Sequence, residues 1–280
     1  MKKLAKLLVL LLSLIALCFT ATACGGSSDP QPTPSVDWDS VFIVNRTGET
    51  ITGLTAYGKT LSKIEIPAAI NGTAVTSIGK DAFDYCDSLT TVTFGDNSQL
   101  TSIGDSAFSS CASLTEIVIP EGVTSIGYSA FANCDSLTNI KVDANNATYK
   151  DIDGNLYSKD GTTLLQYANG KTATIFVFLD SVTSIGEGAF YSCDSLTEIV
   201  IPNGVTSIGS YAFSDCDSLT EIVIPNSVTS IGERAFYDCD SLTIYCKAAS
   251  RPSGWDRDWN KKDLVGNNRL PVFWWGKTGA

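Results

Sequence analysis

The sequence predicts a β-rich solenoid, a right-handed stack of coils of about 23 residues each, and three observations support this fold class. The string Ser-Ile-Gly occurs six times, with its isoleucines 25, 23, 59, 23 and 23 residues apart. A cysteine recurs six times with the same spacings. Each repeat has more apolar residues than one short coil can cover, so neighbouring coils must stack on one another.

Within one repeat, EIVIPNGVTSIGSYAFSDCDSLT, the apolar positions change their period. Its two first isoleucines and the preceding Leu196 have the L-x-x-L-x-L spacing of a strand, and Pro-Asn-Gly then supplies a turn. Ala-Phe, Cys and Leu follow at three-residue steps, which indicates a short helical or 3-10 turn with one apolar edge. Each coil is therefore expected to have a strand and a turn segment.

Residues 140–180 interrupt the regular pattern inside the 59-residue gap. Two apolar runs, residues 156–157 and 163–165, flank an Asp-Gly pair at residues 160–161, which predicts a β-hairpin. The acidic string at residues 151–155 lacks the glycine and glutamate positions of a calcium loop, and a turn before a strand is expected there instead. The segment is interpreted as an aberrant repeat with a hairpin insert.

The first residues have the order of a secretory signal. Three lysines precede an apolar run at residues 7–19, which is too short to span a bilayer comfortably. The sequence Ala-Thr-Ala-Cys24 ends the run, and residues 25–35 form a tether of mainly Gly, Ser and Pro. Removal of the three lysines with the signal peptide makes the remaining chain more acidic than the whole.

The small residues before Cys24, and the Gly-Gly-Ser-Ser after it, resemble the lipobox of bacterial lipoproteins, in which this cysteine becomes the lipid-modified N-terminus. Ala21 stands where that pattern usually has leucine. Ala-Thr-Ala is also an ordinary A-x-A cleavage signal, after which the chain would be freely secreted. The resemblance implies a protein that is lipid-anchored to the bacterial cell envelope and exposed at the surface, with the lipid as its only contact with the membrane.

The composition excludes several classes of function. The formal net charge is −11 and no cluster of Lys and Arg offsets it, so nucleic acid is not an expected partner. The chain contains no histidine, which removes the commonest general base and the commonest nitrogen ligand of metals. We therefore predict no catalytic residue, no metal site and no cofactor.

The repeated cysteines predict a ladder along the stack. Equivalent positions in adjacent coils lie about 4.8 Å apart, which a disulfide tolerates, so both disulfide pairing and a stack of buried thiols remain open. A structural role is favoured because each Cys ends an apolar step beside Phe, where it acts as a small hydrophobe. Cys246 and Cys239 form a further disulfide candidate near the C-terminus. The ladder consists of Cys86, Cys111, Cys134, Cys193, Cys216 and Cys239.

The residues between the buried strand positions are expected to face solvent on one continuous sheet surface. We hypothesise that this surface, rich in Glu, Val and Thr, binds a ligand; an ordinary solvated sheet is the alternative. The candidate residues are Glu116, Val118, Lys141, Glu198, Val200, Glu221, Val223 and Tyr245.

The repeat string I-x-I-P-x-x-V-T-x-I-G-x-x-A-F-x-x-C-x-x-L closely resembles the BspA-like, Treponema-type leucine-rich repeats. The resemblance covers about residues 64–244 and is nearly verbatim in IVIPEGVTSIG, IVIPNGVTSIG and IVIPNSVTSIG. It implies an α/β-type leucine-rich-repeat solenoid and a non-catalytic cell-surface adhesin, with a protein, mucin or glycan ligand on host or neighbouring cells. A structural envelope or scaffold protein is the alternative.

The organisation expected along the chain follows from these patterns. It is a signal peptide (1–23), a lipid-anchor cysteine with tether (24–36), an N-terminal cap with the first strand (37–76), repeats (77–139), the aberrant repeat (140–180), repeats (181–244) and a C-terminal cap (245–280). Caps are expected because an open solenoid end exposes apolar core and unpaired strand edges. The tryptophans of the last segment are expected to seal the core, with stacking on a glycan as the alternative.

Overall fold

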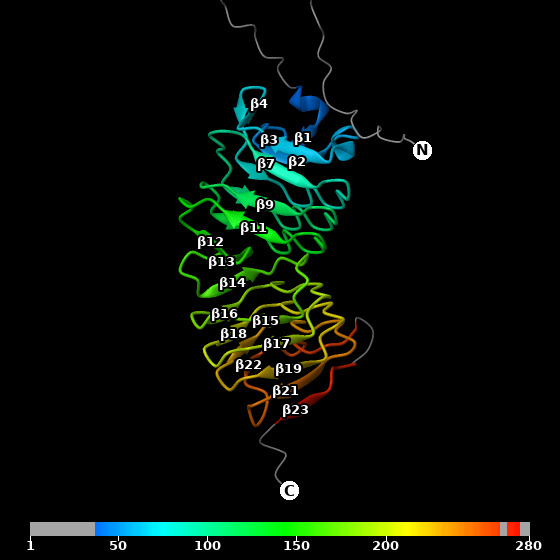
Figure 1. Ribbon diagram of the computed structural model, residues 1–280, viewed down its shortest axis with the longest axis vertical. Helices are drawn as coiled ribbons and strands as arrows, with labels where there is room; N and C mark the ends of the chain where they lie inside the picture. The colour runs from blue at the N-terminus through cyan, green and yellow to red at the C-terminus, as the bar shows by residue number, and fades with distance from the viewer. Residues whose placement is uncertain (1–36, 264–267, 275–280) are drawn as a thin grey trace, which may run out of the picture. The chain divides into compact units, whose positions relative to one another are not determined.

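The computed structural model describes residues 37–263 and 268–274, which form successive coils of β-structure (Figure 1). The expected signal peptide, the lipid-anchor Cys24 and Trp275 lie outside the described residues. Each coil has three sides, which we call the long-strand side, the short-strand side and the turn side. The solenoid predicted from the repeats is confirmed.

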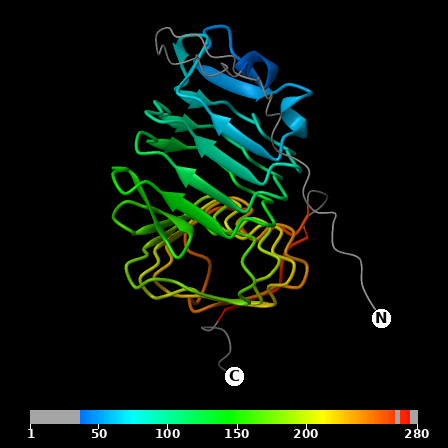
Figure 2. The ribbon, with the colours of Figure 1, turned by 45° about the horizontal axis from the view of Figure 1, so that its top comes forward.

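The long-strand side carries strands of three or four residues that pair in parallel with the equivalent strand of the next coil (Figure 2). Alternate residues point inward, so Ile117 and Ile119 are buried while Val118 between them is exposed. One sheet contains β3 (Lys63–Ile66), β7 (Thr91–Phe94), β9 (Glu116–Ile119) and β11 (Asn139–Val142). A second sheet contains β15 (Ile175–Val177), β17 (Glu198–Val200), β19 (Glu221–Ile224), β21 (Thr243–Cys246) and β23 (Val272–Trp274).

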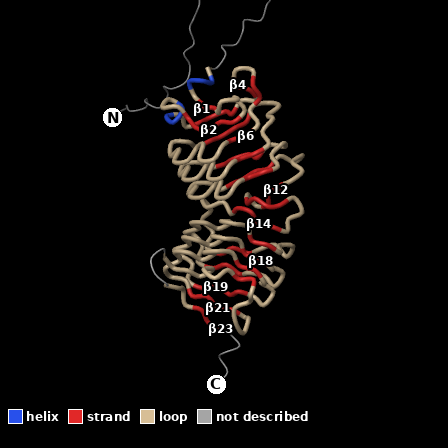
Figure 3. Tube along the Cα trace, turned by 180° about the vertical axis from the view of Figure 1, so that it is seen from behind, coloured by secondary structure: helices blue, strands red, loops and turns tan. Residues whose placement is uncertain are grey.

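The short-strand side is built mainly from two-residue strands at each Ser-Ile pair (Figure 3). Its first sheet contains β1 (Phe42–Val44), β2 (Thr50–Leu54), β6 (Ser77–Ile78), β8 (Ser102–Ile103) and β10 (Ser125–Ile126). Its second sheet contains β12 (Tyr149–Ile152), β13 (Asn155–Ser158), β14 (Thr163–Gln166), β16 (Ser184–Ile185), β18 (Ser207–Ile208), β20 (Ser230–Ile231) and β22 (Gly254–Trp255). Near the N-terminus lie η1 (Trp38–Ser40), η2 (Gly58–Thr60) and the hairpin of β4 (Ala69–Ile70) and β5 (Thr73–Ala74).

The turn side is not helical, which corrects the expected short helical or 3-10 turn. In each repeat two residues four apart have positive φ, for example Tyr211 at 54° and Asp215 at 58°. A left-handed residue in every fourth place interrupts a right-handed helix before it can form. Alternate amides then point along the solenoid axis. For example, the Phe213 amide donates to the Ala235 carbonyl oxygen of the next coil at 2.7 Å. The turn side is thus a third ladder of hydrogen bonds between coils.

Phenylalanines of the turn side fill the interior of the coils. Phe190, Phe213 and Phe236 stack almost in parallel, with ring centroids 5.1 and 5.2 Å apart. The same stacking joins Phe83 to Phe108 at 4.8 Å in the first half of the chain. With the inward isoleucines these rings make two buried clusters, one in each half.

Residues 149–166 form an antiparallel meander of β12, β13 and β14. The hairpin predicted at the Asp-Gly pair 160–161 joins β13 to β14 and is confirmed. A second hairpin joins β12 to β13 through Asp153 and Gly154, whose φ values of 50° and 71° are those of a tight hairpin turn. Only a turn before a strand was expected there, so strand β12 was not predicted.

The meander also separates the two sheets of the long-strand side, because β11 and β15 do not pair. Instead, the β11 edge is closed by the meander: the Ile140 amide donates to the Gly154 carbonyl oxygen at 2.8 Å, and the Val142 amide donates to Asp151 Oδ1 at 2.9 Å. The prediction of one continuous sheet surface is therefore wrong. The physical reason is that residues of a hairpin turn accept the hydrogen bonds of the β11 edge, where the strand of the next coil would otherwise have paired.

The C-terminal segment continues the coils with larger residues. Trp255 pairs with Ile231 in the short-strand ladder, and the Trp259 ring packs edge-on against Phe236 with centroids 5.8 Å apart. Both tryptophans are buried, and Trp255 Nε1 donates to the Val228 carbonyl oxygen at 3.1 Å. Trp274 is half-buried against the same cluster. These indoles cover the last repeat, in agreement with a role in sealing the core.

Candidate functional site

The eight residues of the candidate binding face all lie on the long-strand side, but in two separate sheets. Glu116 and Val118 are in β9 and Lys141 is in β11, whereas the other five are in β17, β19 and β21. The structure therefore brings these residues together as two groups, which we call the first face (β3 to β11) and the second face (β15 to β23).

On the first face, charged and polar side chains of neighbouring strands pair with one another. Lys141 Nζ lies 2.9 Å from Glu116 Oε2, and Asn139 Nδ2 donates to the same oxygen at 2.9 Å. Both charged side chains are well exposed, so the ion pair adds little to stability. The carboxylate of Glu116 is nevertheless already engaged by two neighbours in the sheet.

The second face has a column of apolar side chains that lie in register on consecutive strands. Val177, Val200, Val223, Tyr245 and Phe273 occupy the same position of β15, β17, β19, β21 and β23. Val177 is 74% exposed, Val200 54% and Phe273 49%, so this is surface and not core. The rings of Tyr245 and Phe273 stack with centroids 5.4 Å apart.

Beside this column lies a pair of carboxylates. Glu198 and Glu221 are directly opposite each other in the parallel ladder of β17 and β19, and both are exposed. Like charges in this position disfavour the sheet, so folding alone does not account for them. Together with Val200, Val223 and Lys247 they line an open groove of about 730 Å³. Four of the eight candidate residues thus converge on one concavity.

A smaller cavity of about 160 Å³ lies where the meander meets the preceding coil. Its walls include Tyr128, Tyr149, Gln166 and a single carboxylate, Glu187. An acid and base pair for hydrolysis would require a second carboxylate here, and the lining residues do not provide it. The cavity therefore does not offer the pair of carboxylates that glycoside hydrolysis uses.

The six cysteines of the ladder are buried and unpaired, as is Cys246, so neither the ladder nor the Cys239–Cys246 pair forms a disulfide. Within the described ranges, no group of three or more His, Cys, Asp or Glu residues could hold a metal ion. Burial raises the pKa of Cys134 to about 12, and the hydrogen bond to a neighbouring backbone opposes this only in part. The Cys134 thiol is therefore a weak nucleophile at neutral pH, whereas the hydrogen bond with Cys111 lowers the pKa of Cys86.

The ladder also forms hydrogen bonds that the spacing did not indicate. Cys216 Sγ donates to the Phe190 carbonyl oxygen at 3.0 Å, and Cys239 Sγ donates to that of Phe213 at 2.8 Å. Cys111 and Cys134 make the equivalent bonds to the phenylalanines of their preceding coils, whereas Cys193 Sγ donates to Asn169 Oδ1 at 3.3 Å. The sequence contains the signal, since Phe and Cys always recur three residues apart, but the acceptor becomes visible only when coils are stacked.

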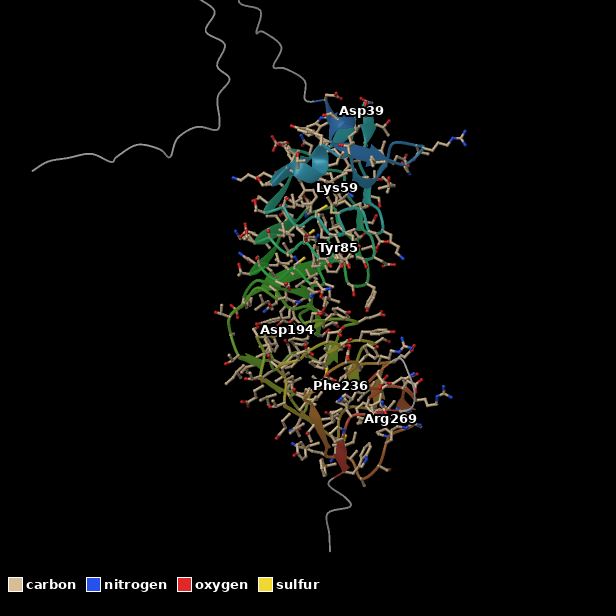
Figure 4. The ribbon with its side chains drawn as sticks, turned by 90° about the vertical axis from the view of Figure 1, so that its right-hand side faces the viewer. Asp39, Lys59, Tyr85, Asp194, Phe236 and Arg269 are labelled. Atoms are coloured by element: carbon tan, nitrogen blue, oxygen red, sulfur yellow. The ribbon has the colours of Figure 1, made fainter. Side chains whose placement is uncertain are left out.

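A cluster of charged and aromatic residues on the turn side was not predicted. Arg234 Nη1 donates to the Tyr211 hydroxyl at 2.7 Å, and its guanidinium carbon lies 5.9 Å from the Tyr211 ring centroid and 5.8 Å from that of Tyr237. The Tyr128 ring lies 6.0 Å from that of Tyr211 and so links coils on either side of the meander. Burial, and to a smaller extent repulsion from carboxylates such as Asp217, raises the pKa of Asp194, which Figure 4 labels. The sequence contains one indication of this cluster, because the residue before each Ala-Phe pair varies among the repeats.

Comparison with known proteins supplies the family. The BspA type leucine rich repeat region matches residues 50–161 and 165–247 in six copies. A search of curated proteins gave no match. In the part of the chain that the structure describes, no helix is long and apolar enough to cross a bilayer.

Among solved structures, the chain is similar to the pneumococcal vaccine antigen PcpA, with 23% identity and a TM-score of 0.57 over 68% of this chain and 53% of that chain. It is also similar to a leucine-rich repeat protein from Eubacterium ventriosum, with 29% identity and a TM-score of 0.49 over 69% of this chain and 64% of the other. The chain spans about half the length of the PcpA structure, and the likeness to PcpA shows the fold.

The repeat profile covers well over half of the chain, and its copies coincide with the coils that pair in register from β2 to β21. The chain therefore belongs to the BspA-type leucine-rich-repeat family.

Proposed function

We propose that this protein is a non-catalytic adhesin of the bacterial cell surface, which contacts matrix proteins, mucin, glycans or other cells through the second face. Membership of a leucine-rich-repeat family suggests a protein-binding role. A rigid stack of coils presents its outward residues at a fixed spacing, which favours repeated contacts with an extended ligand.

The observation that carries the proposal is the groove over β17 and β19. Its floor combines exposed valines, which gain free energy when a ligand covers them, with two opposed carboxylates that are unfavourable in the free sheet. A ligand with a positive group between Glu198 and Glu221 would relieve that repulsion. The groove therefore favours a ligand surface that is both apolar and cationic.

The test measures binding of the mature chain, residues 25–280, to immobilised matrix proteins, mucins and glycans. The variant Glu198→Lys/Val200→Ser/Glu221→Lys/Val223→Ser removes both features of the groove while leaving the buried isoleucines in place. We expect saturable binding of the wild type to one ligand class, and at least about a hundredfold weaker binding of the variant, because several contacts are lost together.

The matched control is Asp96→Lys/Glu121→Lys, which makes the same change in charge at exposed residues outside the long strands. It should bind as the wild type does. Equal binding by the groove variant would reject the second face as the binding surface. Binding to no ligand, combined with self-association of the mature chain, would favour the structural envelope or scaffold protein instead.

The proposed place of action is the envelope, where lipid on Cys24 anchors the chain. The support comes from the sequence before the described residues: an apolar run, small residues and then Cys24. In bacteria that express the full chain, the wild type should partition into detergent and Cys24→Ala into the aqueous phase. Aqueous partitioning of both would show that the chain is freely secreted after cleavage at Ala-Thr-Ala.

A further inference from the structure

Strand β15 begins the second face, and one of its edges points towards the meander. In a parallel sheet, successive residues direct their backbone N–H and C=O groups to opposite edges of the strand. The Thr174 carbonyl oxygen accepts from the amides of Thr197 and Glu198, at 2.8 and 3.2 Å, so Thr174 and then Phe176 face β17. Ile175 and Val177 consequently direct their backbone groups to the opposite edge.

That edge has no strand beside it. β15 is the terminal strand of its sheet, and β17 is its only partner among the described residues. Outside the strand ladder, the hydrogen bonds in the described part of the chain do not include the backbone N–H or C=O of Ile175 or Val177. On the sheet face, the side chains of Ile175 and Val177 are 51% and 74% exposed.

The other long-strand edges near the meander and the N-terminus are protected. At β11 the Ile140 and Val142 amides bond to Gly154 and Asp151 of the meander. At β3 the outward residues are charged, Lys63 and Glu65, which is a common device against strand pairing. β15 has neither protection: its sequence is Ile-Phe-Val, without a charge, a proline or a bulge.

The charges around this edge are mainly acidic. Glu198 lies opposite Ile175 in the neighbouring strand, and the exposed Asp180 follows shortly after β15. Lys171, which precedes the strand, donates a hydrogen bond to the Asp153 carbonyl oxygen of the meander turn. A segment that bound here would meet apolar side chains at alternate positions and carboxylates beside them.

We propose that the open edge of β15 is a strand-addition site for an extended segment of a partner protein in which apolar residues alternate with Lys or Arg. Unpaired N–H and C=O groups at the spacing of a strand are matched only by another extended backbone, and Ile175 and Val177 supply an apolar surface for its side chains. This inference goes beyond the adhesin proposal, because it relies on backbone groups at one edge and not on the groove over β17 and β19.

The first experiment follows backbone amide exchange by NMR in the mature chain. In the free protein the Ile175 and Val177 amides are expected to exchange at least about tenfold faster than the Val200 amide, which belongs to the ladder. Addition of a short synthetic peptide of alternating lysine and valine should slow both by at least about tenfold. A peptide of alternating glutamate and valine should leave them unchanged.

The second experiment uses a matched pair of variants at one position. Val177→Pro removes the N–H that faces the open edge while sparing the pairing with β17, since proline is tolerated on an edge strand in this orientation. Val177→Ala keeps the N–H and shortens the side chain. We expect Val177→Pro to weaken binding of the lysine–valine peptide at least about tenfold and Val177→Ala to change it no more than about threefold. Unchanged exchange of the Val200 amide shows that each variant is folded.

Should Val177→Pro fail to fold, the peptide N-methylated at alternate residues removes the same hydrogen bonds from the ligand and should bind at least about tenfold more weakly than its parent. Protection of the Ile175 and Val177 amides in the free, dilute chain would overturn the proposal, because the edge would be closed. Protection that grows with protein concentration would assign the edge to a second copy of this chain. Equal binding of the acidic peptide or of the N-methylated peptide would also overturn it.

Discussion

At the scale of single residues, five of the six repeat thiols both fill the core and donate a hydrogen bond to the coil before them. Cys216 is fully buried, and its sulfur lies 3.0 Å from the Phe190 carbonyl oxygen. The thiol is a weak donor, but it has the volume of a small hydrophobe, so it satisfies the carbonyl oxygen without burying a strongly polar group. The positions of these cysteines could be predicted from the period alone, whereas the acceptor could not, because it belongs to a residue 26 positions away.

The substitution Cys216→Ala is expected to lower the free energy of unfolding by about 1–2 kcal/mol, because it leaves a small void and removes the donor to Phe190. Urea denaturation followed by circular dichroism measures the loss. Cys86→Ala is the control, since the Cys86 sulfur lies 4.0 Å from the Asp84 carbonyl oxygen of its own coil and bonds to no preceding coil. Equal losses in the two variants would show that the bond between coils is unimportant.

At the scale of an element, a tyrosine side chain ends the first sheet of the short-strand side. The Ile126 amide of β10 donates to the Tyr149 hydroxyl at 3.1 Å, and that hydroxyl donates to the Thr124 carbonyl oxygen at 3.3 Å. One phenol therefore takes the place of the strand that the next coil would have supplied. Sequence patterns predict the hairpin of residues 156–165, because its Asp-Gly turn is local, but this contact depends on how the meander packs.

Removal of that hydroxyl by Tyr149→Phe should lower the free energy of unfolding by about 1–2 kcal/mol, because the Ile126 amide loses its acceptor. The matched control is Tyr157→Phe in the same meander, whose buried ring forms no hydroxyl hydrogen bond in the described part of the chain. Thermal unfolding of both variants gives the comparison. A midpoint for Tyr149→Phe equal to that of Tyr157→Phe would mean that water replaces the phenol without cost.

At the scale of the whole molecule, buried thiols and phenols are expected to make the described coils less stable at alkaline pH. Burial raises the pKa of Cys134 and of Cys246 from 9.0 to about 12, and it raises that of Tyr157 from 10.0 to about 12. Above pH 9 the unfolded chain therefore binds fewer protons than the folded chain, and stability falls as the pH rises. This contribution is fully present below pH 9 and is lost as the pH approaches about 12.

The midpoint of thermal unfolding should accordingly decrease between about pH 9 and pH 12. Cys134→Ala removes one of the shifted groups and should decrease less steeply with pH, whatever its midpoint at neutral pH. A midpoint that stays constant over this pH range would contradict the prediction. The absorbance of the tyrosines, followed in the same samples, separates phenolate from thiolate.

The sequence by itself determined the coil length, the inward residues of the long strands, the buried cysteine positions and the Asp-Gly hairpin. Each of these depends on a period or a turn that extends over a few neighbouring residues. Only the tertiary structure decided that the turn side is non-helical, because Tyr211, Asp215 and most of their equivalents adopt positive φ without being glycine. It likewise decided that the long-strand side is two faces and that one edge of β15 is open. Those features arise because residues of the meander bond to β10 and β11, and contacts across successive coils leave no local mark in the sequence.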